Sequence, residues 1–205
     1  MTNAYVRQNI RTVNTILSVV AILFALYIGI TPFLPEIKYR LFTRNQQLPK
    51  YGLETANNVS QSESQINYPK ENRLVIPSVR IDQQIYEGTD LSVIDNGGVW
   101  RKNLWVTSPE ERGNTVIVGH RFTYKQPEGA LYHLDKIKIG DSISIFWNQK
   151  RLNYTVNDVK TVPETEVDIE KDGGVRELTI YTCTPLLTAT DRLVVTALPQ
   201  ESILE

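Results

Sequence analysis

The sequence predicts an all-β domain, a sandwich or a barrel, preceded by one N-terminal transmembrane helix. From residue 74 onward, the chain runs as short alternating segments separated by Gly, Pro, Asn and Asp, a pattern typical of all-β folds. Residues 12–35, in contrast, contain no charged side chain. An uncharged and mostly apolar stretch of this length is typical of a helix that spans a membrane.

The uncharged segment is long enough to cross a bilayer. At about 1.5 Å per residue its helix reaches roughly 36 Å, more than the hydrocarbon core of about 30 Å, even if prolines fray its end. A cleaved signal peptide is the alternative, but the segment 31–35 offers no small-X-small cleavage site. We therefore expect four parts: a tail (1–11), a transmembrane anchor (12–35), a flexible linker (36–72) and one all-β domain (73–205).

The strands of the domain are predicted from alternation. In 142–147, Ile143, Ile145 and Trp147 lie on one face, and a hairpin loop at 148–150 leads into a returning strand. Residues 130–137 have apolar side chains at helical spacing before a Gly-Asp pair, which predicts a short helix or 3₁₀ turn. The predicted strand segments are 74–77, 79–81, 115–118, 142–147, 151–159, 175–182 and 192–197.

Composition excludes some classes of partner. The chain has 205 residues and a net charge of -1. Residues 1–50 carry six Lys or Arg and one acidic residue, which leaves 16 basic and 22 acidic residues for the rest of the chain. No basic face for nucleic acid is therefore expected. The single cysteine excludes an internal disulfide and does not settle the compartment.

Cys183 is that single cysteine, and its surroundings favour reactivity. It follows the apolar run 178–181, and Arg192 lies nine positions downstream in the last predicted strand. His120 ends another strand-like run and gives the thiol a candidate base. Taken alone, each residue has a simpler interpretation: a buried packing cysteine, a loop histidine or a solvated arginine.

The segment Thr179-Ile180-Tyr181-Thr182-Cys183 resembles the Thr-Leu-X-Thr-Cys signature of the sortases, with isoleucine in place of the usual leucine. With His120 and Arg192 in the family's order, residues 74–197 resemble these membrane-anchored cysteine transpeptidases of mainly Gram-positive bacteria. The resemblance suggests a housekeeping or class E type without assigning a class. It implies an eight-stranded sortase-type β-barrel with short helices, one strand more than the alternation predicts.

The resemblance also implies site roles. Cys183 would attack the peptide carbonyl and form a thioester, while His120 would protonate the departing amine and later deprotonate the incoming one. Arg192 would hold the substrate backbone or the oxyanion, and Thr182 would bind the substrate. The implied partners are exported proteins with a C-terminal Leu-Pro-X-Thr-Gly-like sorting signal, and a peptidoglycan precursor or another amine acceptor.

Other functions stay open beside this one. A pilin-polymerising sortase is one alternative, although residues 45–72 lack an Asp-Pro lid and no second hydrophobic tail follows the domain. An L,D-transpeptidase would need a Ser-His-Gly-Cys arrangement, whereas threonine precedes Cys183 here. The non-enzymatic alternative is a tethered β-barrel that binds wall peptides and merely buries its cysteine.

Two further groups of polar residues have a weaker connection to function. His133, the second histidine, has no family motif behind it, so we expect a structural or solvent-facing role. The second group consists of four acidic residues that precede the cysteine strand, in the loop where some sortases bind calcium. Ca²⁺ prefers such oxygen ligands. We nevertheless expect a solvated loop and no cofactor. These acidic residues are Glu164, Glu166, Asp168 and Glu170.

Two indications from the sequence disagree on the orientation of the anchor in the membrane. Arg7 and Arg11 precede the uncharged segment, while four Lys or Arg follow it by residue 50, so the charge count alone would place the tail outside. The resemblance implies the reverse, a cytoplasmic tail and an extracellular catalytic domain on a single-pass cell-membrane protein. Because long domains are translocated largely regardless of charge, we follow the resemblance.

Overall fold

The computed structural model describes residues 2–42, 68–102 and 108–200, which belong to two compact units, Met1–Thr43 and Arg44–Glu205. The first unit is helical, with α1 (Thr2–Ile30), the 3₁₀ helix η1 (Thr31–Phe33) and α2 (Leu34–Phe42). The α-helix gives way to a 3₁₀ turn at Thr31–Phe33, where Pro32 lacks the backbone N–H that a continued α-helix would use. Helix thus includes the expected tail and enters the expected linker, of which residues 43–67 lie outside the described residues.

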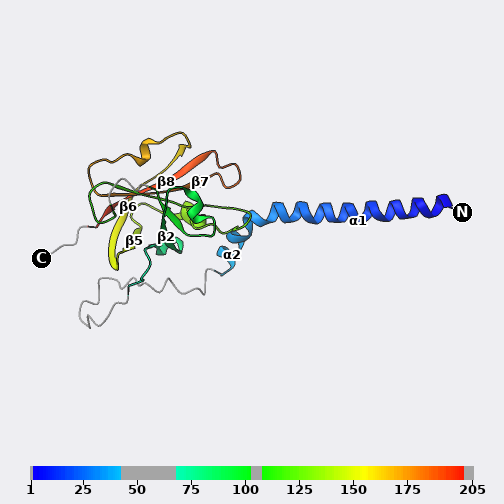
Figure 1. Ribbon diagram of the computed structural model, residues 1–205, viewed down its shortest axis with the longest axis horizontal. Helices are drawn as coiled ribbons and strands as arrows, with labels where there is room; N and C mark the ends of the chain where they lie inside the picture. The colour runs from blue at the N-terminus through cyan, green and yellow to red at the C-terminus, as the bar shows by residue number, and fades with distance from the viewer. Residues whose placement is uncertain (1, 43–67, 103–107, 201–205) are drawn as a thin grey trace. The chain divides into compact units, whose positions relative to one another are not determined.

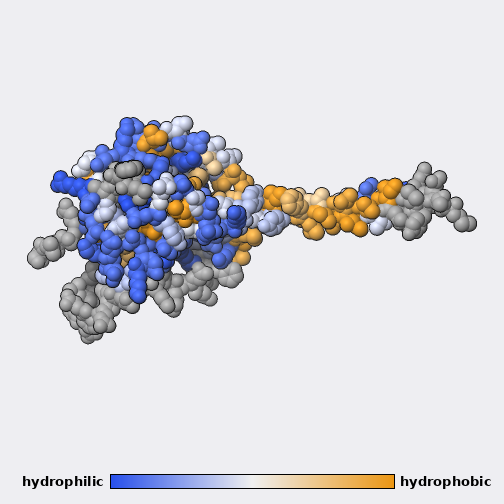
Figure 2. Space-filling model, viewed as in Figure 1, coloured by the Kyte–Doolittle hydropathy of each residue, from blue (hydrophilic) through white to orange (hydrophobic). Residues whose placement is uncertain are grey.

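The helical unit contains one stretch, Ile10–Leu41, that is long and apolar enough to span a membrane. Its large apolar side chains are exposed, with Leu17, Leu23 and Phe24 at 60% or more. Figure 2 shows these apolar residues along the described part of α1. A helix that exposes apolar side chains all round is suited to a lipid environment, which agrees with the predicted anchor.

The second unit is a closed eight-stranded barrel (Figure 1) with the strand order β1-β2-β3-β4-β7-β8-β6-β5. Most neighbours are antiparallel, but β2 pairs with β3 and β4 pairs with β7 in parallel. The strands are β1 (Arg73–Ile76), β2 (Ile81–Glu87), β3 (Val99–Arg101), β4 (Asn114–Val118), β5 (Ser142–Trp147), β6 (Lys150–Pro163), β7 (Glu177–Thr184) and β8 (Asp191–Pro199). The 3₁₀ turns are η2 (Pro77–Val79), η3 (Leu91–Ile94), η4 (Tyr132–Lys136) and η5 (Asp168–Glu170).

Apolar residues cover both faces of β4, β7 and β8. Alternate residues point into the main core, for example Ile117 and Ile180. Their neighbours Val116, Val118 and Tyr181 belong to a second apolar cluster with Trp100 and Val194. Because side chains alternate between the faces of a strand, this second cluster lies on the opposite face of the same strands. This part of the sheet is therefore covered by apolar side chains on both sides.

The predicted alternation in 142–147 is confirmed. Ile143, Ile145 and Trp147 all belong to the main core, and the hairpin after them turns through Asn148 and Gln149, both at positive φ. Residues 130–137 contain the 3₁₀ turn η4. The segment 79–81 is wrong as a strand because η2 occupies its start, and β2 extends beyond it to Glu87.

The eighth strand is the one that alternation does not predict. β3 has only three residues, too few to show a period. It forms because β2 and β4 pair with it on its two edges. The eight-stranded barrel implied by the resemblance is therefore confirmed, and the count of seven falls short for this reason.

Candidate active site

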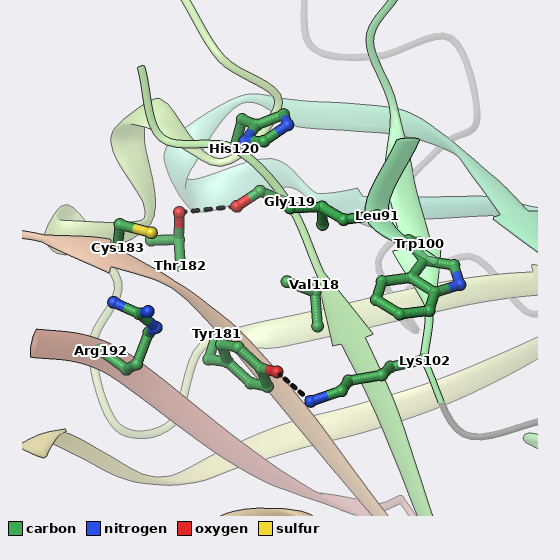
Figure 3. A pocket seen from close by; sticks show the side chains of 10 residues that line it. All are labelled: Leu91, Trp100, Lys102, Val118, Gly119, His120, Tyr181, Thr182, Cys183 and Arg192. Atoms are coloured by element: carbon green, nitrogen blue, oxygen red, sulfur yellow. Dashed lines mark hydrogen bonds between the residues drawn. The ribbon is translucent and has the colours of Figure 1, made fainter. Parts of the chain in front are cut away.

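A pocket of about 200 Å³ opens where β4 and β7 end and β8 begins. It contains the four residues singled out from the sequence, which come from three strands or from the residues that follow them. Figure 3 shows the pocket and its side chains. Its lining residues are Leu91, Trp100, Lys102, Val118, Gly119, His120, Tyr181, Thr182, Cys183 and Arg192.

Cys183 lies near the end of β7 and is only partly buried. It is the Cα partner of Arg192 across the antiparallel pair β7–β8. Directly opposed residues of an antiparallel pair place their side chains on the same face, and the guanidinium of Arg192 points toward the sulfur (Figure 3). The nine-residue spacing in the sequence therefore corresponds to a connection between β7 and β8 that brings Cys183 and Arg192 opposite each other.

The guanidinium of Arg192 is held from two sides. Its Nη1 donates to the carbonyls of Ala189 and Asp191, each at 3.0 Å, and its Nη2 pairs with a carboxylate oxygen of Glu164 at 3.0 Å. The side chain of Arg192 is 22% exposed. A planar guanidinium has five donors, so these contacts orient the group and still leave it able to present an N–H to a ligand in the pocket.

Thr182 is 1% exposed, and its hydroxyl donates to the carbonyl of Gly119 at 2.8 Å. The residue before the cysteine is therefore fastened to the residue before the histidine. Gly119 is needed here, because a Cβ at this position would approach Leu131 to 2.7 Å. Thr182 lines the pocket, as expected for a residue that binds substrate. Its hydroxyl, however, already donates its hydrogen to an internal carbonyl.

The other end of the pocket is formed by a charged network over an apolar base. Lys102 donates to the hydroxyl of Tyr181 at 3.1 Å, and this hydroxyl donates to Glu170 at 2.7 Å. Lys102 also forms an ion pair with Glu170. Burial, reinforced by the hydrogen bond to the Glu170 carboxylate, raises the pKa of Tyr181. The phenol is therefore a neutral donor throughout the physiological range.

The four acidic residues singled out from the sequence, which lie in the loop after β6, have different partners. Glu164 pairs with Arg192 and Glu170 with Lys102. Asp168 pairs with Lys171, and Glu166 accepts the backbone N–H of Asp168. Within residues 2–42, 68–102 and 108–200, no three such side chains gather in a way that would hold a metal ion.

His133 lies away from this pocket. It is 6% exposed, its Nε2 is 3.8 Å from a carboxylate oxygen of Glu128, and it lines a separate, more polar hollow. Lys102 and Trp100, in contrast, line the cysteine pocket and were not identified from the sequence. Both belong to or follow β3, the strand whose short length hid it from alternation.

The chain is similar in sequence to a known protein family. The model of the sortase domain family matches residues 74–200, more than half of the chain. Sortase A of Listeria monocytogenes is 27% identical over 132 residues, which cover 62% of this chain and 57% of that protein. Sortase D of Bacillus subtilis is 26% identical over 147 residues, 67% of this chain and 68% of that protein.

A solved structure agrees with these relatives. The crystal structure of sortase C-1 from Actinomyces oris is 28% identical, covers 66% of this chain and 77% of that one, and has a TM-score of 0.56. The similar proteins thus carry the names of three sortase types, A, C and D, at nearly equal identity. The match does not favour one type over the others.

Proposed function

The chain belongs to the sortase family, and from this premise we propose that it is a cysteine transpeptidase whose catalytic residues are Cys183, His120 and Arg192. The observation that carries the proposal is their convergence on one pocket from β7, β8 and the segment that follows β4. The cysteine is partly accessible, as a nucleophile requires, whereas a purely structural thiol is typically buried and inert.

The reaction proceeds in two half-reactions. In the first, the thiolate of Cys183 attacks the scissile carbonyl, the C–S bond forms, and the C–N bond breaks as His120 protonates the departing amine. In the second, an incoming amine attacks the thioester, the C–S bond breaks, and His120 takes the proton of the new amide nitrogen. The guanidinium of Arg192 stabilises the oxyanion or holds the substrate backbone in both steps.

The proposed substrate is a C-terminal sorting signal of the Leu-Pro-X-Thr-Gly kind on an exported protein, cut after its threonine. The proposed acceptor is the amine of a peptidoglycan precursor. The apolar side chains of Val118, Trp100 and Leu91 line the pocket beside the site, which supports an extended peptide with apolar residues. We further propose that no metal ion is required, since Glu164, Glu166, Asp168 and Glu170 each have a protein partner.

The helical unit supports a single-pass membrane anchor, and we propose that the catalytic domain lies outside the cell. A protease added to intact cells that express the full chain should then degrade the barrel while α1 stays protected. Protection of the barrel until the cells are lysed would reverse the orientation.

The test of the activity uses the full chain in detergent micelles with a small library of quenched sorting-signal peptides and amine acceptors. We expect a transfer product with the unmodified chain, none with Cys183→Ala, and no effect of a chelator on the rate. Equal rates for both proteins would refute the mechanism. A methanethiosulfonate reagent should also label Cys183 rapidly, whereas slow labelling would favour a non-catalytic barrel that binds peptides.

A further inference from the structure

The backbone pairing of β4 and β7 stops short of the two residues that must react. These strands pair in parallel with Val118 opposite Tyr181, and the N–H of Gly119 donates to the carbonyl of Tyr181 at 3.4 Å. The same register, continued by two residues, sets His120 opposite Cys183. Both residues therefore lie just beyond the regular ladder between β4 and β7.

Two side-chain hydrogen bonds continue the register past that end. The hydroxyl of Thr182 donates to the carbonyl of Gly119 at 2.8 Å, one residue before the pair. The Nη1 of Arg121 donates to the hydroxyl oxygen of Thr184 at 3.0 Å, one residue after it. Each bond joins residues 63 apart in the sequence, the separation of His120 and Cys183. The pair is thus bracketed on both sides.

Arg121 is fixed by contacts other than the one to Thr184. Its Nη2 forms an ion pair with Asp135 at 2.9 Å, and its Nε donates to the carbonyl of Tyr132 at 3.4 Å. Its side chain is only 12% exposed. The backbone joins the same region, since the N–H of Leu131 donates to the carbonyl of His120 at 3.1 Å. One planar guanidinium therefore ties the histidine segment, η4 and the cysteine strand together.

The chemistry depends on this alignment. Proton transfer between imidazole, thiol and amine requires hydrogen-bond distances, and a misplacement of about 1 Å can cost on the order of 100-fold in rate. A guanidinium holds its three contacts in a fixed fork, whereas a lysine ammonium is a single point charge on a flexible stem. The residue type at position 121 thus matches a positioning task.

We propose that Arg121, acting through Thr184, is a positioning residue that keeps Cys183 in register with His120. The inference rests on the proposed function, because it assigns a partner to the two residues that the mechanism uses. Arg121 touches neither substrate nor the reacting atoms. It extends the parallel pairing of β4 and β7 to the point where the reaction takes place.

The test removes the hydroxyl that accepts the hydrogen bond and keeps the size of the side chain. In the full chain in detergent micelles, Thr184→Val should lower kcat about tenfold and leave KM within about twofold, because alignment and not substrate affinity is lost. Thr184→Ser keeps the hydroxyl and should restore kcat to near the unmodified value. Arg121→Met should lower kcat further than Thr184→Val. Arg73→Met is the control, since Arg73 pairs with Asp82 through a side chain that is 23% exposed and does not line the pocket.

A second measurement reads the coupling without any substrate. Iodoacetamide alkylates Cys183, the only cysteine of the chain. Thr184→Val should slow this alkylation when it is the only substitution, but it should have no effect in a protein that already carries His120→Ala. Equal kcat and equal alkylation rates for Thr184→Val and the unmodified chain would overturn the proposal, even if the thermal midpoint fell. Absence of any Cys183-dependent transfer would refute the proposed function alone, because the alkylation series would still decide the role of Arg121.

Discussion

Thr182 donates its hydroxyl to the carbonyl of Gly119 at 2.8 Å, and this bond fastens the cysteine strand to the histidine segment in the interior of the protein. Thr179, three residues earlier on the same strand, is equally buried at 1% exposed. Its hydroxyl oxygen, however, has no hydrogen-bond partner among the described residues. The two threonines therefore form a natural comparison.

Thr182→Val should destabilise the protein by about 1–3 kcal/mol, because it leaves the buried Gly119 carbonyl without its donor. Thr179→Val should be neutral or stabilising, since it removes a hydroxyl that makes no bond. Thermal unfolding of the two variants measures the difference. If Thr179→Val costs as much as Thr182→Val, the loss comes from packing and the bond to Gly119 contributes nothing.

Gly129→Ala should reduce the transfer rate strongly. A Cβ at this position would lie 2.4 Å from the carbonyl oxygen of His120 and 2.6 Å from that of Arg121, so the histidine segment must shift. Gly173→Ala is the control, because nothing lies within 4 Å of its added Cβ. Initial rates and circular dichroism of both variants test this expectation. A fully active Gly129→Ala protein would show that the segment tolerates displacement.

Arg192→Lys should lower kcat by about 100-fold or more, the typical cost of losing an oxyanion donor. An ammonium cannot keep the contacts to Ala189, Asp191 and Glu164 while also reaching into the pocket. Stability should change little, since Glu164 is 58% exposed and such pairs contribute about 0–1 kcal/mol.

Arg151→Lys serves as the control for this substitution, because Arg151 binds Asn153 on β6 and does not line the pocket. Steady-state rates of both variants decide the outcome. An Arg192→Lys protein with unmodified kcat would remove the guanidinium from the mechanism.

Tyr181 should make stability depend on pH in the alkaline range. Its pKa in the folded protein is raised, first by burial and then by the hydrogen bond to Glu170. A group with a raised folded pKa contributes stability that is complete below its unfolded pKa of about 10 and is lost as the pH rises above it. The free energy of unfolding should therefore fall above about pH 10, since the unfolded chain releases this proton first.

Tyr181→Phe should flatten that decline, whereas Tyr124→Phe, at a ring that is 53% exposed, should leave it unchanged. Denaturant unfolding at a series of alkaline pH values measures both. An identical decline in Tyr181→Phe and the unmodified chain would contradict the assignment.

Several features of the protein follow from the order of its residues alone. The uncharged run 12–35 predicts a helix suited to a membrane, and the alternation in 142–147 predicts a strand with Ile143, Ile145 and Trp147 on one face. Both predictions hold, because each depends on local spacing that any packing of the chain must satisfy. The candidate site residues can also be predicted from the sequence, since the motif around Cys183 carries the resemblance.

The tertiary structure decided what local spacing does not encode. β3 exists because β2 and β4 pair with its edges, and Lys102 reaches the pocket only through that strand. The bond between Arg121 and Thr184 depends on the parallel pairing of β4 with β7, which joins residues 63 apart. Such contacts depend on where distant segments meet, and a one-dimensional pattern carries no signal for that meeting.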